Sequence, residues 1–205
     1  MFDKLEKTIS TIMVDVLSKD RKEVLQPLID YIQEKVNHQE KIRLNFICTH
    51  NSRRSHLSQI WAQTMAFYYE IPNVTCYSAG TEATALFYMV AETLKKQGFE
   101  YEKLEEGTNP IYAIKFDVNE PAVIAFSKTL QHTFNPISNF AAIMTCSSAN
   151  EACPFVSGAE KRFFVQYEDP KKIDNTDKME QGYWDKSIEI ATEMAYVFSK
   201  IQNGK

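Results

Sequence analysis

The residues most suited to chemistry lie in one short segment, CTHNSRRS, which begins at Cys48 and ends at Ser55. A cysteine thiolate is a strong nucleophile, and Arg54, six positions later, carries a planar guanidinium that can hold two oxygens of an anion. Ser55 is placed to hydrogen-bond the thiolate, and Asn51 tolerates the left-handed backbone that a tight loop needs. The pattern C-x5-R-S therefore predicts a thiolate that meets a tetrahedral oxyanion.

This segment lies between a predicted strand and a predicted helix. Residues 42–47 largely alternate apolar and polar side chains, the period of a strand, whereas apolar residues over 56–69 recur at spacings of three and four, the period of a helix. A loop in this position points backbone N–H groups and the positive end of the helix dipole at one spot. A C-x5-R spacing alone also fits a buried strand cysteine beside an incidental surface arginine, but its position between strand and helix favours the functional interpretation. We expect the oxyanion site to be lined by Thr49, His50, Asn51, Ser52, Arg53, Arg54 and Ser55.

The composition of the whole chain limits the class of protein. Its 205 residues are 44% hydrophobic and 24% charged, which suits one domain with an appendage. A net charge of −4 and a pI near 5.6 argue against nucleic acid as a partner. We find no apolar run of about 18 residues and no positively headed apolar leader, so we expect no membrane partner, no signal peptide and a cytoplasmic protein. In that compartment the four cysteines are expected to be reactive, metal-bound or buried rather than structural disulfides.

The remaining pattern alternates strands and helices. Residues 1–40 are predicted to be a helical extension that packs on the core or makes a homodimer contact, followed by a catalytic domain over 41–205. The alternation predicts an α/β fold, a three-layer α/β/α arrangement with a central parallel sheet and helices on both faces. Further strands are expected at 74–78, 140–144 and 163–167, and further helices at 84–97, 147–152 and 181–201.

Residues 99–137 are the hardest part of the chain to assign. Two apolar runs, 111–116 and 122–126, predict a hairpin around the turn 117–121, which begins with Asp117 and ends with Pro121. Such a hairpin can extend the edge of the sheet or hang over the pocket, and the sequence leaves both open.

Two more cysteines and one acid follow predicted strands. Cys146 comes directly after 140–144, so it is expected at the same end of the sheet as the loop cysteine, and Asp169 follows 163–167. Pro170 fixes the backbone beside Asp169, which suits a positioned proton donor. The seven-residue separation of Cys146 and Cys153 suits neither a zinc site nor C-x-x-C, and no histidine cluster predicts a metal. A redox pair fits this spacing better, although the spacing alone does not establish it; Cys76, in mid-strand, reads as a buried apolar group.

Three separated stretches resemble one family. The stretches 46–55, 77–80 and 144–154, together with Glu168-Asp169-Pro170, are similar to the thioredoxin-coupled arsenate reductases, which share the fold of the low-molecular-weight protein tyrosine phosphatases. The resemblance covers about 41–201 and is interrupted by an insertion at about 105–135. The first motif is common to both branches, whereas the second cysteine pair points to the reductases.

The resemblance implies a mechanism without a bound cofactor or metal. Cys48 would attack arsenate held by the loop amides and Arg54, while Asp169 protonates the leaving oxygen. Cys146 would then attack Cys48 and release arsenite, and Cys153 would attack Cys146. The resulting disulfide would be reduced by an external dithiol such as thioredoxin.

The sequence also departs from the family and leaves other functions open. His50 stands where many relatives have glycine, Arg53 adds a second positive charge near the loop, and Lys171 stands where phosphatases often place a tyrosine. The alternative is a low-molecular-weight protein tyrosine phosphatase that hydrolyses phosphomonoesters through a phosphocysteine, with Cys146 and Cys153 idle or redox-regulatory. A non-catalytic oxyanion-binding module is the third.

Overall fold

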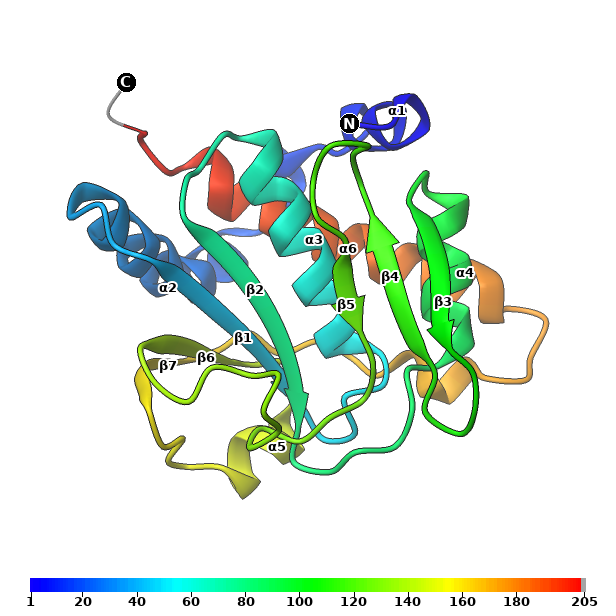
Figure 1. The fold of residues 1–205 in the computed structure, drawn as a ribbon. Helices are drawn as coiled ribbons and strands as arrows, with labels where there is room; N and C mark the ends of the chain where they lie inside the picture. Colours follow the sequence, from blue (N-terminus) through cyan, green and yellow to red (C-terminus); the bar gives the residue numbers. More distant parts are fainter. Residues whose placement is uncertain (204–205) are drawn as a thin grey trace.

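The computed structural model describes residues 1–203, and Figure 1 shows the order of its elements. The helices are α1 (Asp3–Ser10), α2 (Lys19–Asn37), α3 (Arg54–Tyr68), α4 (Tyr88–Lys96), α5 (Ser147–Ala152) and α6 (Met179–Ser199), with 3-10 turns at Val14–Val16 and Pro170–Ile173. The strands are β1 (Ile42–Cys48), β2 (Val74–Gly80), β3 (Glu100–Glu105), β4 (Ile111–Lys115), β5 (Val123–Ala125), β6 (Phe140–Met144) and β7 (Ala159–Phe164). Across the described residues, no helix combines the length and the apolar character needed to cross a membrane.

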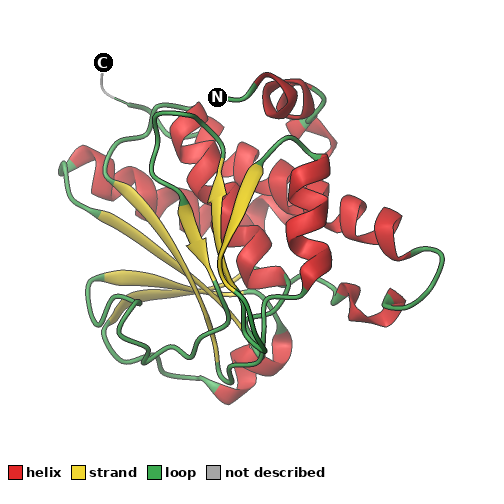
Figure 2. Cartoon of the chain, turned by 45° about the vertical axis from the view of Figure 1, so that its right-hand side comes forward, coloured by secondary structure: helices red, strands yellow, loops and turns green. Residues whose placement is uncertain are grey.

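A four-stranded parallel sheet forms the centre of the fold, in the order β2-β1-β6-β7. Helices α2, α3 and α6 pack on one face, and α5 covers the other face near the carboxyl ends of β1 and β6 (Figures 1 and 2). This confirms the predicted α/β class with a central parallel sheet between helices. In the register of the sheet, Cys48 lies opposite Gly80 of β2, and Ile47 lies opposite Met144 of β6. The ends of β1 and β6 that carry cysteines are therefore neighbours.

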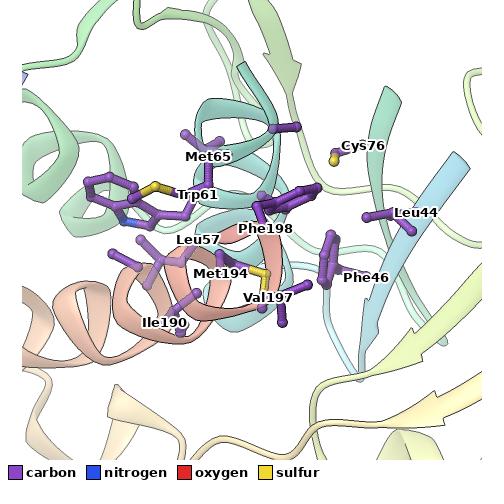
Figure 3. Packing of buried hydrophobic residues seen from close by; sticks show 14 of the residues in the cluster. Leu44, Phe46, Leu57, Trp61, Met65, Cys76, Ile190, Met194, Val197 and Phe198 are labelled. Atoms are coloured by element: carbon purple, nitrogen blue, oxygen red, sulfur yellow. The ribbon is translucent and has the colours of Figure 1, made fainter. Parts of the chain in front are cut away.

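The alternation along β1 gives each face of the sheet its own core. Leu44 and Phe46 point toward α3 and α6 and belong to the same buried cluster as Trp61 and Phe198 (Figure 3). All four side chains are fully or almost fully buried, and each contributes about 1.5–3 kcal/mol relative to an exposed position. Ile47 belongs to the smaller core under α5. This packing on both faces fixes where β1 ends, and hence where the loop cysteine lies.

The insertion forms a second sheet, which the sequence left undecided. The predicted hairpin is present as β4 and β5, and β3, which the sequence did not predict, pairs with β4 to give an antiparallel sheet in the order β3-β4-β5. It lies beside β2 (Figure 1), and an isolated bridge between Gly80 and Thr129 joins the end of β2 to the segment after β5. The insertion thus returns to the sheet at the end that carries the cysteine loop.

The two sheets do not pair along their length, because side chains of α3 occupy the edge of β2. The Gln63 amide donates to Val74 O and accepts from Cys76 N, as a residue of a neighbouring strand would, and Gln59 donates to Cys76 O. A hollow of about 440 Å³ lies between this edge and β5. The exposed edge is therefore satisfied without a further strand.

Several element boundaries differ from the prediction. Of the two helices in residues 1–40, the first already ends at Ser10, and α4 begins at Tyr88 rather than at 84, because 84–87 lie outside the helix. The last strand lies at Ala159–Phe164 instead of 163–167. Beyond its end, Val165 N still donates to Met144 O and Tyr167 N to Thr145 O. Leu25 and Ile32 of α2 are fully buried in the main core, so the N-terminal helices pack on the domain.

Candidate active site

The loop that begins at Cys48 is held by a chain of side-chain hydrogen bonds. Cys48 is the last residue of β1 and is buried, with its Sγ 3.1 Å from Ser55 Oγ. Asn51 has the left-handed backbone expected for it (φ 44°), and its Nδ2 donates to Ser55 Oγ at 2.8 Å. The Ser55 hydroxyl, fixed by Asn51, is therefore aimed at the sulfur, where it can stabilise a thiolate.

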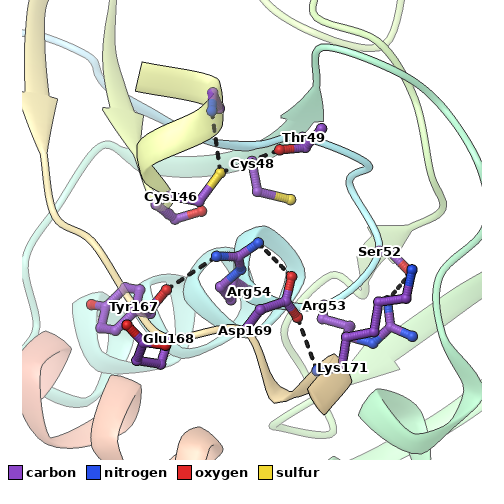
Figure 4. Close-up of polar contacts among 12 residues, drawn as sticks. Cys48, Thr49, Ser52, Arg53, Arg54, Cys146, Tyr167, Glu168, Asp169 and Lys171 are labelled. Atoms are coloured by element: carbon purple, nitrogen blue, oxygen red, sulfur yellow. Dashed lines mark hydrogen bonds and ion pairs between the residues drawn. The ribbon is translucent and has the colours of Figure 1, made fainter. Parts of the chain in front are cut away.

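Arg54 and Asp169 meet beside this sulfur. Arg54 Nη2 lies 2.6 Å from Asp169 Oδ2, and Nη1 donates to Tyr167 O at 3.1 Å (Figure 4). The other carboxylate oxygen of Asp169 accepts from Lys171 N at 3.0 Å, which is an N-cap contact to the short turn after Pro170. The guanidinium and the carboxyl are thus both fixed on the side of the loop that Cys48 faces.

Cys146 lies against the same loop. Its buried Sγ is 3.5 Å from Thr49 Oγ1 and accepts from Ala149 N at 3.4 Å, so it caps α5 (Figure 4). The structure therefore brings Cys146 next to the residue that follows Cys48 in the chain. Cys153 lies at the other end of α5 and is half-buried.

Arg162 of β7 holds the end of α5 that carries Cys153. Its Nε donates to Cys153 O at 3.0 Å, and its Nη2 donates to Asn150 Oδ1 at 2.6 Å and to Asn150 O. Charge-assisted bonds to the last carbonyls of a short helix stabilise its C-terminal turn.

The side chain of Arg53 departs from the prediction. Instead of facing the loop, its guanidinium stacks 4.2 Å from the centre of the Phe87 ring and contacts Tyr183 OH and Asp174 Oδ2, each at 2.6 Å. Burial and the bond to Asp174 raise the pKa of Tyr183. Asp174 neutralises the arginine, so its charge anchors α3 to α6 and its side chain lies outside the oxyanion site (Figure 4).

The other predicted site residues occupy the rim or lie away from it. The His50 side chain is 44% exposed and its nearest charged neighbour is Glu82, at 3.8 Å, while Ser52 Oγ accepts a long bond from Arg53. Thr49 faces Cys146, as described above. Cys76 is remote from the loop, and burial raises the pKa of its thiol, which makes it a poor nucleophile.

Solved structures with this architecture now give the fold a name. A low-molecular-weight phosphotyrosine phosphatase from Vibrio cholerae O395 superposes with a TM-score of 0.52 and 11% identity, covering 77% of this chain and 94% of its own. A low-molecular-weight protein tyrosine phosphatase from T. tengcongensis gives 0.53 and 16%, covering 78% and 100%. An arsenate reductase in the phosphate-binding state gives 0.50 and 14%, covering 78% and 99%.

The chain has the low-molecular-weight phosphatase fold. At these identities the likeness establishes the architecture alone. A comparison of the sequence with protein-family models finds no match, and a comparison with curated proteins finds none either. The chemistry of this phosphatase-fold chain therefore has to be argued from its own residues.

Sequence reasoning missed the residues that support the site from a distance. Ser127 and Lys128, just after β5, form hydrogen bonds to the cysteine loop. Arg162 holds the end of α5, and the Tyr167 carbonyl accepts a hydrogen bond from Arg54. None of them stands in a local pattern, because each acts through a contact between segments far apart in sequence. A lysine two residues after an apolar run is at most a weak signal of a role at the site.

The assembled groups support anion chemistry at sulfur. A buried thiol, a guanidinium and a carboxyl lie close together (Figure 4), and a second thiol lies against the loop. Over residues 1–203, histidine, cysteine and acidic side chains form no group of three or more that could hold a metal ion. The arrangement offers a nucleophile, an anion cradle, a proton donor and a second sulfur.

Proposed function

We propose that the chain is an arsenate reductase that uses Cys48 as its nucleophile and passes the oxidation through Cys146 and Cys153. The position of Cys146 carries the proposal: its sulfur lies 3.5 Å from Thr49 Oγ1, in the loop of the nucleophile, although it is 98 residues away from Cys48 in sequence. A hydrolase has no step that needs a second buried thiol there, whereas a thiol cascade does.

The first step forms an arsenic–sulfur bond. The Cys48 thiolate attacks arsenate, whose oxygens are held by the loop amides and by Arg54, and one oxygen leaves as water after Asp169 has given it a proton. The contact between Arg54 and Asp169, at 2.6 Å, supports these two roles, because it keeps the acid beside the guanidinium that binds the anion.

The second step transfers two electrons to arsenic. The sulfur of Cys146 attacks the sulfur of Cys48, a disulfide forms, and the electron pair of the broken arsenic–sulfur bond stays on arsenic. Arsenic(V) leaves as arsenite, and two thiols have become one disulfide. Cys153 then attacks Cys146 and releases the Cys48 thiolate.

This last step requires α5 to change shape. The two cysteines flank a helix of six residues, and seven residues of helix span about 10 Å, whereas a disulfide needs Cα atoms within about 7 Å. We propose that α5 unwinds at its Cys153 end, where Arg162 holds the carbonyls of Asn150 and Cys153. Cys153 is the less buried of the two, which supports reduction of the final disulfide by an external dithiol such as thioredoxin.

Variants in which one cysteine is replaced by serine test the proposal. The measured quantity is the arsenate-dependent oxidation of thioredoxin. Cys146→Ser is expected to stop after one adduct on Cys48, and Cys153→Ser is expected to accumulate the Cys48–Cys146 disulfide. Cys76→Ser, a change at another buried cysteine, serves as the control and keeps turnover. Sustained arsenate reduction by Cys146→Ser would overturn the proposal.

The phosphatase alternative has one observation in its favour. An open groove of about 760 Å³ runs beside the loop, between His50, Phe87, Tyr88, Lys103 and Lys171. Arsenate needs no such space, whereas the organic part of a phosphomonoester does. This alternative expects steady hydrolysis of p-nitrophenyl phosphate that depends on Cys48 and Asp169 and survives Cys146→Ser.

A further inference from the structure

The segment that closes the insertion is bonded to the back of the cysteine loop. Ser127 is 2% exposed, and its Oγ donates to His50 O and accepts from Thr84 N, both at 2.8 Å. Its own backbone is fixed on both sides by the Asn109 side chain, which accepts from Ser127 N and donates to Ser127 O. Ser127 therefore holds the loop backbone, and its own backbone is fixed by Asn109.

Lys128 continues this contact to the nucleophile. Its backbone N donates to Asn51 Oδ1 at 2.9 Å, and the Asn51 amide in turn donates to Ser55, whose hydroxyl lies 3.1 Å from Cys48 Sγ. One chain of hydrogen bonds thus runs from the insertion to the sulfur. The left-handed conformation of Asn51, which few residue types adopt easily, depends on such anchoring.

The side chain of Lys128 is buried without an acidic partner. It is 1% exposed, and its Nζ donates to Ser78 Oγ at 3.3 Å and Phe126 O at 3.2 Å, above the rings of Phe126 and Phe134. No carboxylate pairs with it among the residues that the structure describes. The titratable group that faces it is His56 of α3, which shares Ser78 Oγ at 3.1 Å.

Both of these groups are held away from their charged forms. Burial lowers the pKa of Lys128 to about 7, and burial together with Lys128 lowers the pKa of His56 well below its usual value. An unpaired buried ammonium is costly for the fold, so its retention points to a role in binding negative charge. Ser78, which accepts from the ammonium, lies two residues before Gly80, the partner of Cys48 in the sheet, and two residues of strand span about 7 Å.

We propose that Ser127 and Lys128 are positioning residues for the oxyanion loop. Ser127 holds its backbone, and Lys128 supplies positive charge behind the loop when a thiolate or an oxyanion in front of it stabilises the ammonium form. The insertion is thus part of the active site. The inference rests on the oxyanion-binding part of the proposed function and holds for a reductase or a phosphatase.

Two variants separate this role from simple support of the fold. Ser127→Ala removes the bond to His50 O, and Lys128→Met removes the charge but keeps the backbone N–H on Asn51. Inorganic phosphate is the probe, measured by calorimetry, and Cys48 alkylation by iodoacetamide is followed against pH. We expect at least about a fivefold loss of phosphate affinity in each variant and, for Lys128→Met, an alkylation profile moved to higher pH. Lys115→Met, in the insertion, and Ser138→Ala, just after it, are expected to match the wild type.

The outcomes are distinct. Lys128→Met is expected to keep or raise the melting temperature, so a loss of phosphate affinity in a stable variant cannot come from unfolding. Wild-type affinity and a wild-type alkylation profile in both folded variants would overturn the proposal. If the wild type itself binds no phosphate, the proposed function fails, and the alkylation profile, which needs no ligand, still decides the role of Lys128.

Discussion

Arg54 and Asp169 form an ion pair with 2.6 Å between Nη2 and Oδ2, although 115 residues separate them in sequence. The guanidinium and the carboxylate therefore contact each other directly. In the proposed mechanism Arg54 holds the oxyanion and Asp169 donates a proton to the leaving oxygen, so this contact keeps the donor beside the bound anion. The proposed function therefore assigns anion binding and proton donation to two residues in direct contact.

The first prediction concerns Asp169→Asn. Loss of the proton donor should lower the rate of the first chemical step about 100- to 10,000-fold, the usual range for a general acid. Phosphate affinity should stay equal or increase, because the amide brings no charge against the anion. Single-turnover kinetics and calorimetry measure the two effects. Glu168→Gln, at the exposed acid next to it, is the control, and an Asp169→Asn rate within twofold of wild type would contradict the assignment.

The two adjacent arginines should respond differently to the same change. Arg54→Gln should lose about 2–3 kcal/mol of phosphate binding, the scale of charge-assisted bonds to an anion. Arg53→Gln should instead lower the free energy of unfolding by about 1–3 kcal/mol, because the Asp174 carboxylate loses its cation and keeps only the bond from Tyr183 OH. Calorimetry and denaturant unfolding of both variants check this, and the reverse pattern would place Arg53 in the oxyanion site after all.

Lys128→Met should stabilise the fold in a pH-dependent way. Because burial lowers the pKa of Lys128 to about 7, the unfolded chain binds more protons than the folded chain between about pH 7 and 10.5, and this group makes the fold more stable as pH rises through that window. The cost of burying the charge is complete below pH 7. The variant should therefore gain about 1–3 kcal/mol at pH 6 and less at pH 9. Denaturant unfolding at both pH values measures the gain, and a gain independent of pH would contradict it.

Arg162→Gln should make α5 easier to unwind. Without the bonds to Asn150 and Cys153, formation of the Cys146–Cys153 disulfide should be about tenfold faster, which corresponds to about 1.4 kcal/mol. The rate is measured with fully reduced protein and an oxidised small dithiol, so that arsenate is not needed. Lys161→Gln, at the exposed neighbour, is the control and should leave the rate of disulfide formation unchanged. An unchanged rate in Arg162→Gln would contradict the proposed unwinding of α5.

Much of the site follows from local sequence. The alternation before Cys48 and the helical period after Ser55 fix the loop between β1 and α3, and the apolar run before Cys146 fixes β6. Parallel pairing then brings both cysteines to one end of the sheet. These features are predictable because each depends on periodicity within one short segment.

Other features depend on partners far away in sequence. Strand β3 reads EYEKLE and is mostly exposed, so it has no apolar alternation and forms only because β4 pairs with it. Arg53 adjoins Arg54, yet Asp174 and Tyr183 turn it away from the loop. The sequence around Lys128 has no pattern of charges that would predict a buried cation.

One measurement tests the central claim most directly. Reduced protein is given one equivalent of arsenate, free thiols are blocked, and the disulfides are mapped by mass spectrometry. The account predicts a Cys146–Cys153 disulfide that forms only with arsenate, and a Cys48–Cys146 disulfide in Cys153→Ser. Arsenite produced without either disulfide, or neither disulfide with arsenate present, would contradict it.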